Sequence, residues 1–425
     1  MGNLKKFNNV YINLIIASII PFLIWGPFVP DLIVSISALF FFYLIIKNKK
    51  FYYFFNKPLI IFFTFCIYCI FLSIFVAEEI LLSFESSLFY FRIGVFSCFI
   101  WYLIDQDKNI LTYFYYALIL CFSALVIDGY FQYITGANIF GLEINNVRVS
   151  SFFGDELIMG SYLSRLFPLL FALFLVKQKK KFEVYFVGLL FILVDVLIYM
   201  SGERTAFFFL NLSTIFIIFL IKDYQKFRLA TFVIAVICII FLSINSNLTD
   251  RMFKDTAKDM GFIKDTTKDM GLINDNKDRK LTFFTPIHDS LYRTGYKMFK
   301  DKIIVGHGPK IFRLKCMDKK YATGISPCST HPHHFYVQLL AETGIIGFLF
   351  LVSVLIYVLY NALRQLKSII LKKKRPLTDY QVCLLAGILI TVSPFNPNGN
   401  FFNNWLMIVY SLPVGFYLQS IYSKQ

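Results

Sequence analysis

The chain has 425 residues, of which 57% are hydrophobic and only 16% are charged. Soluble proteins carry about a quarter charged residues, so this composition excludes an ordinary soluble enzyme and indicates a polytopic membrane protein. The net charge of +16 is also found in nucleic-acid-binding proteins, but here most Lys and Arg residues lie in short tracts between apolar runs. Membrane topology explains these tracts better, and no nucleic-acid partner is expected.

Apolar runs long enough to span a bilayer, which takes about 17 to 25 helical residues, recur along the whole chain. They cover residues 10–28, 30–46, 58–76, 83–104, 109–134, 156–176, 182–200, 204–221, 228–245, 334–360, 379–396 and 402–421. The sequence therefore predicts an all-α polytopic membrane protein with about 12 transmembrane helices, surrounded by membrane lipids.

Basic tracts mark every second junction between these runs. They lie at residues 5–6, 47–57, 177–181, 222–228 and 364–375. By the positive-inside rule these junctions are cytoplasmic, which places both termini in the cytoplasm and residues 246–332 outside. We therefore expect three parts: residues 1–245 with nine helices, residues 246–332 as a large outer loop with a fold of its own, and residues 333–425 with three more helices.

Cys316 and Cys328 are the only two of the eight cysteines that fall in a polar segment. In an oxidising compartment they predict a disulfide that closes a loop directly before a group of histidines. A metal site formed by Cys328 and those histidines is the alternative. The paired C-x-x-C spacing typical of zinc sites is absent, so we expect no metal.

Arginines gather on the expected outer face: Arg148, Arg165, Arg204, Arg293 and Arg313. Charged groups at membrane depth usually line a cavity or pathway, and arginine is the side chain best shaped for bidentate contacts with phosphate. The alternative for Arg165, two turns into its apolar run, is an anchor that extends to the membrane surface.

His331, His333 and His334 crowd the junction between the long outer segment and the run that follows it. Pro332 suits the first turn of a helix, whose N-terminus would favour an anion. Imidazoles beside such a helix end suggest chemistry on a phosphorylated lipid. Within the helix, spacing by four places His334, Gln338 and Glu342 on one stripe, so the pattern alone favours His334.

Four segments together resemble the O-antigen ligase/polymerase superfamily. They are Arg148…Phe153-Gly-Asp-Glu156, Gly202-Glu-Arg-Thr-Ala206, Gly306-His-Gly308…Phe312 and His333-His-Phe-Tyr-Val-Gln-Leu-Leu-Ala-Glu-Thr-Gly344. The last has the form His-Asn-x-Tyr-Leu-Gln-x-x-x-Glu-x-Gly-x-x-Gly. The motifs cover residues 120 to 350, and the twelve-span plan extends the resemblance to the whole chain. The motif histidine is His333, and His334 replaces the usual asparagine, so either imidazole could act.

The resemblance implies a glycosyltransferase of the C type in the bacterial inner membrane, and no cofactor is expected. Because the sequence has no DxD-like cluster with a clear outer position, a metal-independent mechanism is favoured. Such an enzyme takes a glycan from undecaprenyl diphosphate and passes it to an acceptor hydroxyl on the periplasmic side. By the family's logic Arg204, with Arg148 or Arg293, holds the diphosphate, His333 orients or deprotonates the acceptor hydroxyl, and Glu342 supports the helix end.

Three functions remain open at this stage. Ligation of O-antigen to the glycolipid lipid A-core is favoured over polymerisation of repeat units, in which the acceptor is a glycan. A glycan or lipid transporter is the alternative from another class, but the two halves of the chain show no internal repeat.

Overall fold

The computed structural model describes residues 2–145, 147–177, 180–244, 247–259 and 284–423. These residues form an all-α polytopic membrane protein, with two isolated β-bridges in the segment between residues 137 and 148 as the only extended pairing among them.

Each of the twelve expected positions holds an apolar helix. Nine of these in the described part of the chain are long and apolar enough to cross a membrane: α3 (Phe28–Asn48), α4 (Lys57–Phe75), the α5–α6 stretch (Ile80–Leu88 and Phe91–Gln106), α7 (Asn109–Thr135), α8 (Met159–Val176), α9 (Lys181–Met200), α11 (Gln225–Ile244), α16 (Phe335–Ile370) and α18 (Asn404–Tyr422). Three are shorter: the apolar part of α1 (Gly2–Ala17) with α2 (Ile19–Trp25), α10 (Arg204–Leu220) and α17 (Asp379–Thr391). The expected run 379–396 stops at Thr391 because the segment that follows contains Pro394.

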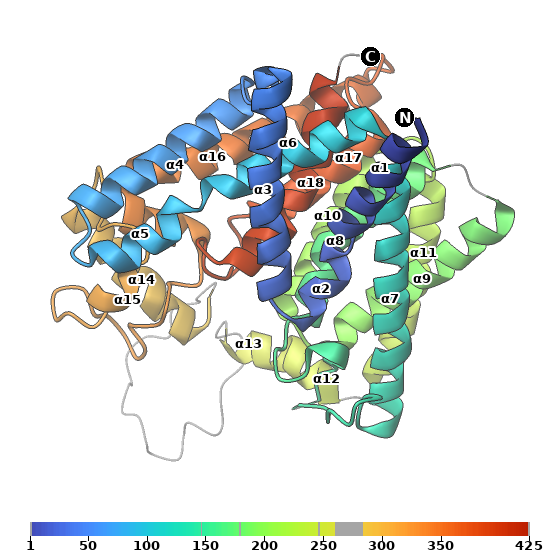
Figure 1. Ribbon diagram of the computed structural model, residues 1–425. Coiled ribbons are helices and arrows are strands. Elements are labelled where there is room, and N and C mark those ends of the chain that lie inside the picture. The colour runs from blue at the N-terminus through green and yellow to red at the C-terminus, as the bar shows by residue number, and fades with distance from the viewer. Residues whose placement is uncertain (1, 146, 178–179, 245–246, 260–283, 424–425) are drawn as a thin grey trace.

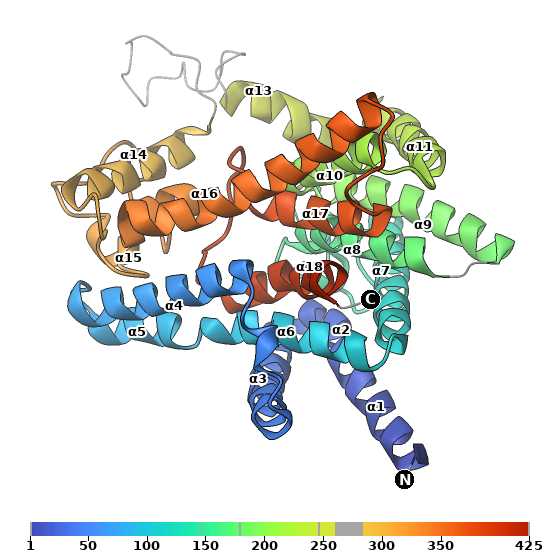
Figure 2. The ribbon, with the colours of Figure 1, turned by 90° about the horizontal axis from the view of Figure 1, so that it is seen from above.

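The centre of the bundle is formed by α8, α17, α18 and α6, which pack against one another in sequence-distant pairs. Almost every side chain of α8 is buried, as expected for a helix that is apolar on all sides. The helices α3 and α11 lie at the periphery, and Figure 2 shows α1 and α3 projecting from the rest. The central helices thus fix the positions of the loops at their ends.

The long segment between α11 and α16 is partly described. It contains α12 (Asn247–Thr249), the π-helical turn η3 (Asp250–Lys254), α13 (Asp255–Asp259), α14 (Pro286–Asp301) and α15 (Phe312–Lys315). Helix α14 packs on α16, and a small apolar core between them includes Leu291, Met298 and Phe312. The expected boundary at residues 245 and 246 lies outside the described residues.

The start of α1 and the end of α18 lie on the same side of the molecule, at the top of Figure 1. The helices α12 and α13 lie at the opposite side. Short helices near residues 51–53 (η1, Phe51–Tyr53) and 151–153 (η2, Ser151–Phe153) belong to the connecting segments.

Candidate functional site

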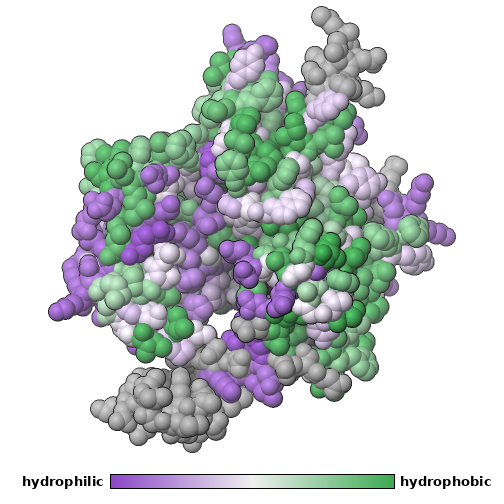
Figure 3. All heavy atoms as spheres, turned by 60° about the horizontal axis from the view of Figure 1, so that its bottom comes forward, coloured by the Kyte–Doolittle hydropathy of each residue, from purple (hydrophilic) through white to green (hydrophobic). Residues whose placement is uncertain are grey.

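A cavity of about 1140 Å³ lies among the loops at one end of the bundle. Its wall comes from the turn between α2 and α3, the segment before α8, the turn between α9 and α10, the segment before α16 and the segment between α17 and α18. Figure 3 shows a hollow bordered by hydrophilic residues on this face. Sequence-distant segments therefore meet around one solvent-accessible space.

Arginines dominate the charge of this cavity. Among the described residues, those that line it are Arg148, Arg165, Arg204, Arg251 and Arg313, accompanied by the carboxylates of Glu156 and Glu203. An excess of guanidinium groups with low-dielectric walls attracts an anion that carries several charges. The predicted Arg293 does not line the cavity; it lies exposed on α14, with its Nε atom 2.7 Å from Asp289.

Arg165 is enclosed by aromatic rings at the inner wall of the cavity. Its guanidinium lies 4.5 Å from the ring centroid of Phe209 and 4.4 Å from that of Tyr410. One terminal nitrogen donates to Asn398 Oδ1 at 3.4 Å. The side chain therefore extends into the protein instead of toward the membrane surface, and the two rings hold its position through cation–π attraction.

Glu203 joins the turn between α9 and α10 to the start of α8. Its carboxylate accepts hydrogen bonds from the backbone N–H groups of Gly160 (2.6 Å) and Ser161 (3.1 Å) and from the Ser161 hydroxyl (2.7 Å). The first amides of a helix have no partner within the helix, and a carboxylate satisfies them well. Glu203 thereby fixes α8, and with it Arg165, relative to Arg204.

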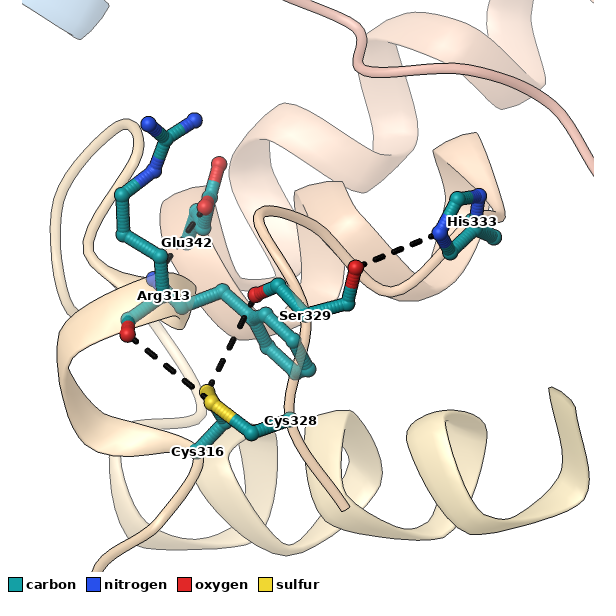
Figure 4. Close-up of a disulfide and its surroundings, with 7 residues drawn as sticks. Arg313, Cys316, Cys328, Ser329, His333 and Glu342 are labelled. Atoms are coloured by element: carbon teal, nitrogen blue, oxygen red, sulfur yellow. Dashed lines mark hydrogen bonds between the residues drawn. A yellow bond between two sulfur atoms is a disulfide. The ribbon is translucent and has the colours of Figure 1, made fainter. Parts of the chain in front are cut away.

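Two histidines line the same cavity as the arginines of the α9–α10 turn. The ring centroids of His331 and His333 are 4.0 Å apart. His333 has a left-handed backbone conformation (φ 55°), and its Nε2 atom lies 3.3 Å from the Ser329 hydroxyl, as Figure 4 shows. Burial lowers the pKa of His333, and burial together with the nearby His333 lowers the pKa of His331 to about 3. The neutral form of both rings therefore predominates at pH 7.

His334 has a different environment from that of His333. It does not line the cavity, and its ring donates through Nε2 to the carbonyl of Pro394 at 3.1 Å. The helix was expected to start near Pro332, but α16 starts at Phe335 with His334 as its N-cap. The left-handed conformation of His333 explains this difference, because it is incompatible with a right-handed helix.

Glu342 lies behind the cavity wall and is fully buried. Its carboxylate accepts from the amide of Gln338 at 3.0 Å and from the backbone N–H of Phe312 at 3.2 Å. Gln338 in turn accepts from the backbone N–H of Phe401 at 2.9 Å. The expected stripe of residues 338 and 342 therefore connects α16 to α15 and to the segment before α18, on which Asn398 lies.

The segment Gly306–Gly308 packs against a kink in α16. Gly344 interrupts the helix with φ 64° and ψ −163°. There, the backbone N–H of His307 donates to Ala341 (3.0 Å), that of Gly308 donates to Glu342 (2.7 Å), and that of Ile345 donates to Ile303 (2.8 Å). This segment therefore supplies the backbone partners that the kinked helix lacks, and it does not line the cavity.

Cys316 and Cys328 are joined by a disulfide that closes the segment before the histidines. The Cys316 sulfur lies 3.9 Å from the Ser329 carbonyl oxygen, and Figure 4 shows Ser329 between the disulfide and His333. The bond thus holds the residue whose hydroxyl contacts the imidazole. Among the described residues, no group of three or more His, Cys, Asp or Glu side chains is placed to hold a metal ion.

Arg251 was not among the arginines singled out from the sequence. It belongs to η3, and it lines the cavity beside Arg148 and Arg204. The available signal was its position, because it is the first arginine after the ninth apolar run, at the end of that run that was expected to face outward.

Comparison with known families agrees with the motifs. Residues 187–352 match the family model described as O-antigen ligase, which confirms the resemblance stated above. The matched segment contains the α9–α10 turn, Arg251, the long loop and the first half of α16. It supports glycan transfer of the O-antigen ligase/polymerase type, with a lipid-linked glycan and an acceptor as partners. No curated protein matches the chain.

Proposed function

Because residues 187–352 match the family model described as O-antigen ligase, we propose that this protein transfers a glycan from undecaprenyl diphosphate to an acceptor hydroxyl, with lipid A-core as the acceptor. The reaction takes place at the periplasmic face of the bacterial inner membrane, and both termini are cytoplasmic. The observation that carries this proposal is one cavity lined both by clustered arginines and by the imidazoles of His331 and His333.

The arginines suit the diphosphate of the donor. Arg148 and Arg204 line the cavity together with Arg165, whose side chain is buried. Planar guanidinium groups contact two phosphate oxygens at once, and they stabilise the negative charge that grows on the diphosphate as it leaves. Arg313 lies on the histidine side, where Figure 4 shows it near Glu342.

The histidine side suits the acceptor. The acceptor oxygen attacks the anomeric carbon of the glycan while the bond from that carbon to the phosphate oxygen breaks. The electron pair of the broken bond stays on undecaprenyl diphosphate, and the proton of the acceptor hydroxyl passes to the imidazole of His333. A neutral imidazole can accept this proton, and general-base help of this kind contributes roughly 10²–10⁴-fold to a rate.

The decisive experiment compares lipid-linked and surface glycans in cells that lack the protein. Long polymer that stays on the carrier lipid and is missing from the surface supports a ligase, whereas single repeat units on the carrier indicate a polymerase. If the protein is a transporter, the glycan stays on its carrier lipid. The purified protein then transfers no glycan to an acceptor and releases no undecaprenyl diphosphate.

Two variants locate the chemistry in the same cells. His333→Ala should fail to restore the surface glycan, because its ring lines the cavity. His334→Ala is the matched control, since the adjacent ring faces Pro394 instead, and it should restore most of the glycan when present at equal level in the membrane. Full restoration by His333→Ala, with loss in His334→Ala, would move the chemistry to His334.

A further inference from the structure

Three arginines from separate parts of the chain meet at the turn between α9 and α10. Arg148 comes from the segment before α8, Arg204 is the first residue of α10, and Arg251 belongs to η3 at the start of the long loop. All three line the cavity. Because Arg251 is the only one contributed by the long loop, this turn is where the loop joins the arginine side of the cavity.

The backbone of this turn holds the guanidinium groups in place. Arg148 donates through Nε to the carbonyl of Ser201 at 3.0 Å, and Arg251 donates through Nε to the carbonyl of Gly202 at 3.1 Å. Arg204 in turn donates through Nε to the backbone carbonyl of Arg251 at 3.1 Å. These Nε bonds order the side chains before a ligand binds, which lowers the entropic cost of binding.

Close approach of the arginines depends on Gly202. Its φ is +64°, and a Cβ atom there would lie 2.9 Å from Arg148 Cγ and 3.1 Å from Arg251 Nε. Arg251 makes no further side-chain hydrogen bond among the described residues besides the one to Gly202. The terminal nitrogens of its guanidinium are therefore available for an anion.

Positive charge gathers at this turn, where the three arginines line one cavity. Burial lowers the pKa of Arg148, and the nearby Arg251 lowers it further, although Glu203 acts in the opposite direction. The carboxylate oxygens of Glu203 are already engaged by the first amides of α8. Clustered cations of this kind bind an anion with more than one charge more strongly than a singly charged one.

We propose that Arg251 completes, with Arg148 and Arg204, the binding site for the diphosphate of the carrier lipid and sets its preference for a diphosphate over a monophosphate headgroup. This inference rests on the proposed function. A diphosphate that links lipid and glycan gains a further negative charge when the glycan leaves, so a third guanidinium acts most strongly after bond cleavage has begun. In this proposal the long loop contributes Arg251 to the binding of the diphosphate.

The test uses the purified full-length protein in detergent and labelled undecaprenyl diphosphate as the probe. Displacement by unlabelled undecaprenyl phosphate gives the preference for diphosphate, and inorganic pyrophosphate separates recognition of the headgroup from that of the lipid chain. Wild-type protein should prefer the diphosphate by at least about tenfold. The Arg251→Gln variant should lose most of this preference. Inorganic pyrophosphate should also displace the labelled lipid from this variant less well than from wild type.

Lys254→Gln is the matched control. Lys254 lies in the same helical turn, is largely exposed, and pairs with Asp250 at 2.6 Å. Its removal changes the net charge equally and should leave the preference unchanged. If Arg251→Gln yields too little folded protein, Arg251→Lys gives the same comparison, because an ammonium group cannot contact two phosphate oxygens in the bidentate manner of arginine.

Two results would overturn different parts of the argument. A preference that survives in Arg251→Gln and Arg251→Lys would refute the role of Arg251 and leave the proposed function intact. Wild-type protein that binds both lipids equally would refute the diphosphate site itself, and with it the donor assigned under the proposed function.

Discussion

His333 has the surroundings expected of a residue that receives a proton. Its left-handed backbone conformation costs a non-glycine residue about 1–3 kcal/mol. The backbone N–H of Asn398 donates to its carbonyl at 2.8 Å and helps to hold this conformation. In return the ring lines the cavity, whereas the ring of His334 contacts Pro394. The backbone conformation at His333 thus directs two imidazoles that are adjacent in sequence into different surroundings.

The pH dependence of transfer should reflect this environment. Burial lowers the pKa of His333 below the ordinary value of 6.5, so the neutral, proton-accepting form persists as the pH falls. We expect the midpoint of the acid decline in kcat/KM to lie below pH 6.5, measured with purified protein and lipid-linked donor across acid and neutral pH. A midpoint above 6.5 would contradict a buried His333 with a lowered pKa.

The lowered pKa values of His331 and His333 also affect the free energy of unfolding, which can be measured independently of activity. Below pH 6.5 the unfolded chain binds protons at His331 and His333 that the folded protein does not bind. The free energy of unfolding should therefore fall as the pH is lowered from 6.5 toward about 3, the value for His331. Replacement of His331 by Asn should reduce this dependence in thermal unfolding experiments.

The sequence located the histidine junction, and the choice between His333 and His334 as the acting residue stays a prediction. The stripe rule favoured His334, yet it holds only within a helix, and α16 starts after that residue. Inside the helix the rule worked, because Gln338 and Glu342 bond to each other. The motif pointed to His333. No periodic pattern could reveal Arg251, because its position depends on a turn from another part of the chain.

Helix α16 connects the site to the core through its kink. The segments before and after Gly344 run in different directions, and the kink allows the first segment to carry Gln338 and Glu342 under the cavity while the second crosses the membrane. The backbone of Ile303–Gly308 occupies the space beside the kink. The orientation of the histidine segment relative to the bundle therefore depends on this contact between two elements.

Gly344→Ala should disturb this contact strongly. The new Cβ atom would overlap the carbonyl group of Ile304, and the backbone conformation of Gly344 is one that only glycine adopts readily. We expect a loss of unfolding free energy of about 2–4 kcal/mol and a marked loss of transfer. Gly141→Ala is the control, since it also has a positive φ but no atom within 4 Å of the added Cβ. Equal effects of both variants would show that the contact is unimportant.

The disulfide is the second link between elements, because it ties the end of α15 to the histidine segment. It closes a loop with a sequence separation of 12, and bonds of this kind contribute about 2–4 kcal/mol. Cys328→Ser should lower stability by this amount and reduce transfer, measured by thermal unfolding and turnover. A reducing agent should reproduce the effect in wild type and add nothing in the variant. Unchanged wild-type behaviour on reduction would contradict a role for the bond.

At the scale of the whole molecule, the apolar runs predicted the architecture well. Each of the twelve expected positions holds an apolar helix, since burial in lipid demands continuous hydrophobic helices that are easily recognised. The length of α10 agrees with the expected run, but two other lengths differ: α17 ends at Thr391, before a proline-containing segment, and α16 continues to Ile370, beyond the expected end at residue 360. The contacts among loops could not be predicted, because they depend on how the central helices α8, α17 and α18 pack.

The orientation of the whole molecule can be tested with one pair of cysteine variants. Lys297 is exposed on α14, and Lys373 is exposed just after the end of α16. The two substitutions Lys297→Cys and Lys373→Cys remove the same charge on sides that the positive-inside rule assigns to opposite compartments. A membrane-impermeant thiol reagent applied to cells with a permeable outer membrane should label the first variant and leave the second unlabelled until the inner membrane is broken.

The natural free cysteines are buried, except for the partly buried Cys238, so wild type sets the background. The reverse pattern would place the cavity and its arginines in the cytoplasm, where the disulfide would be reduced and the proposed donor site would face the wrong compartment.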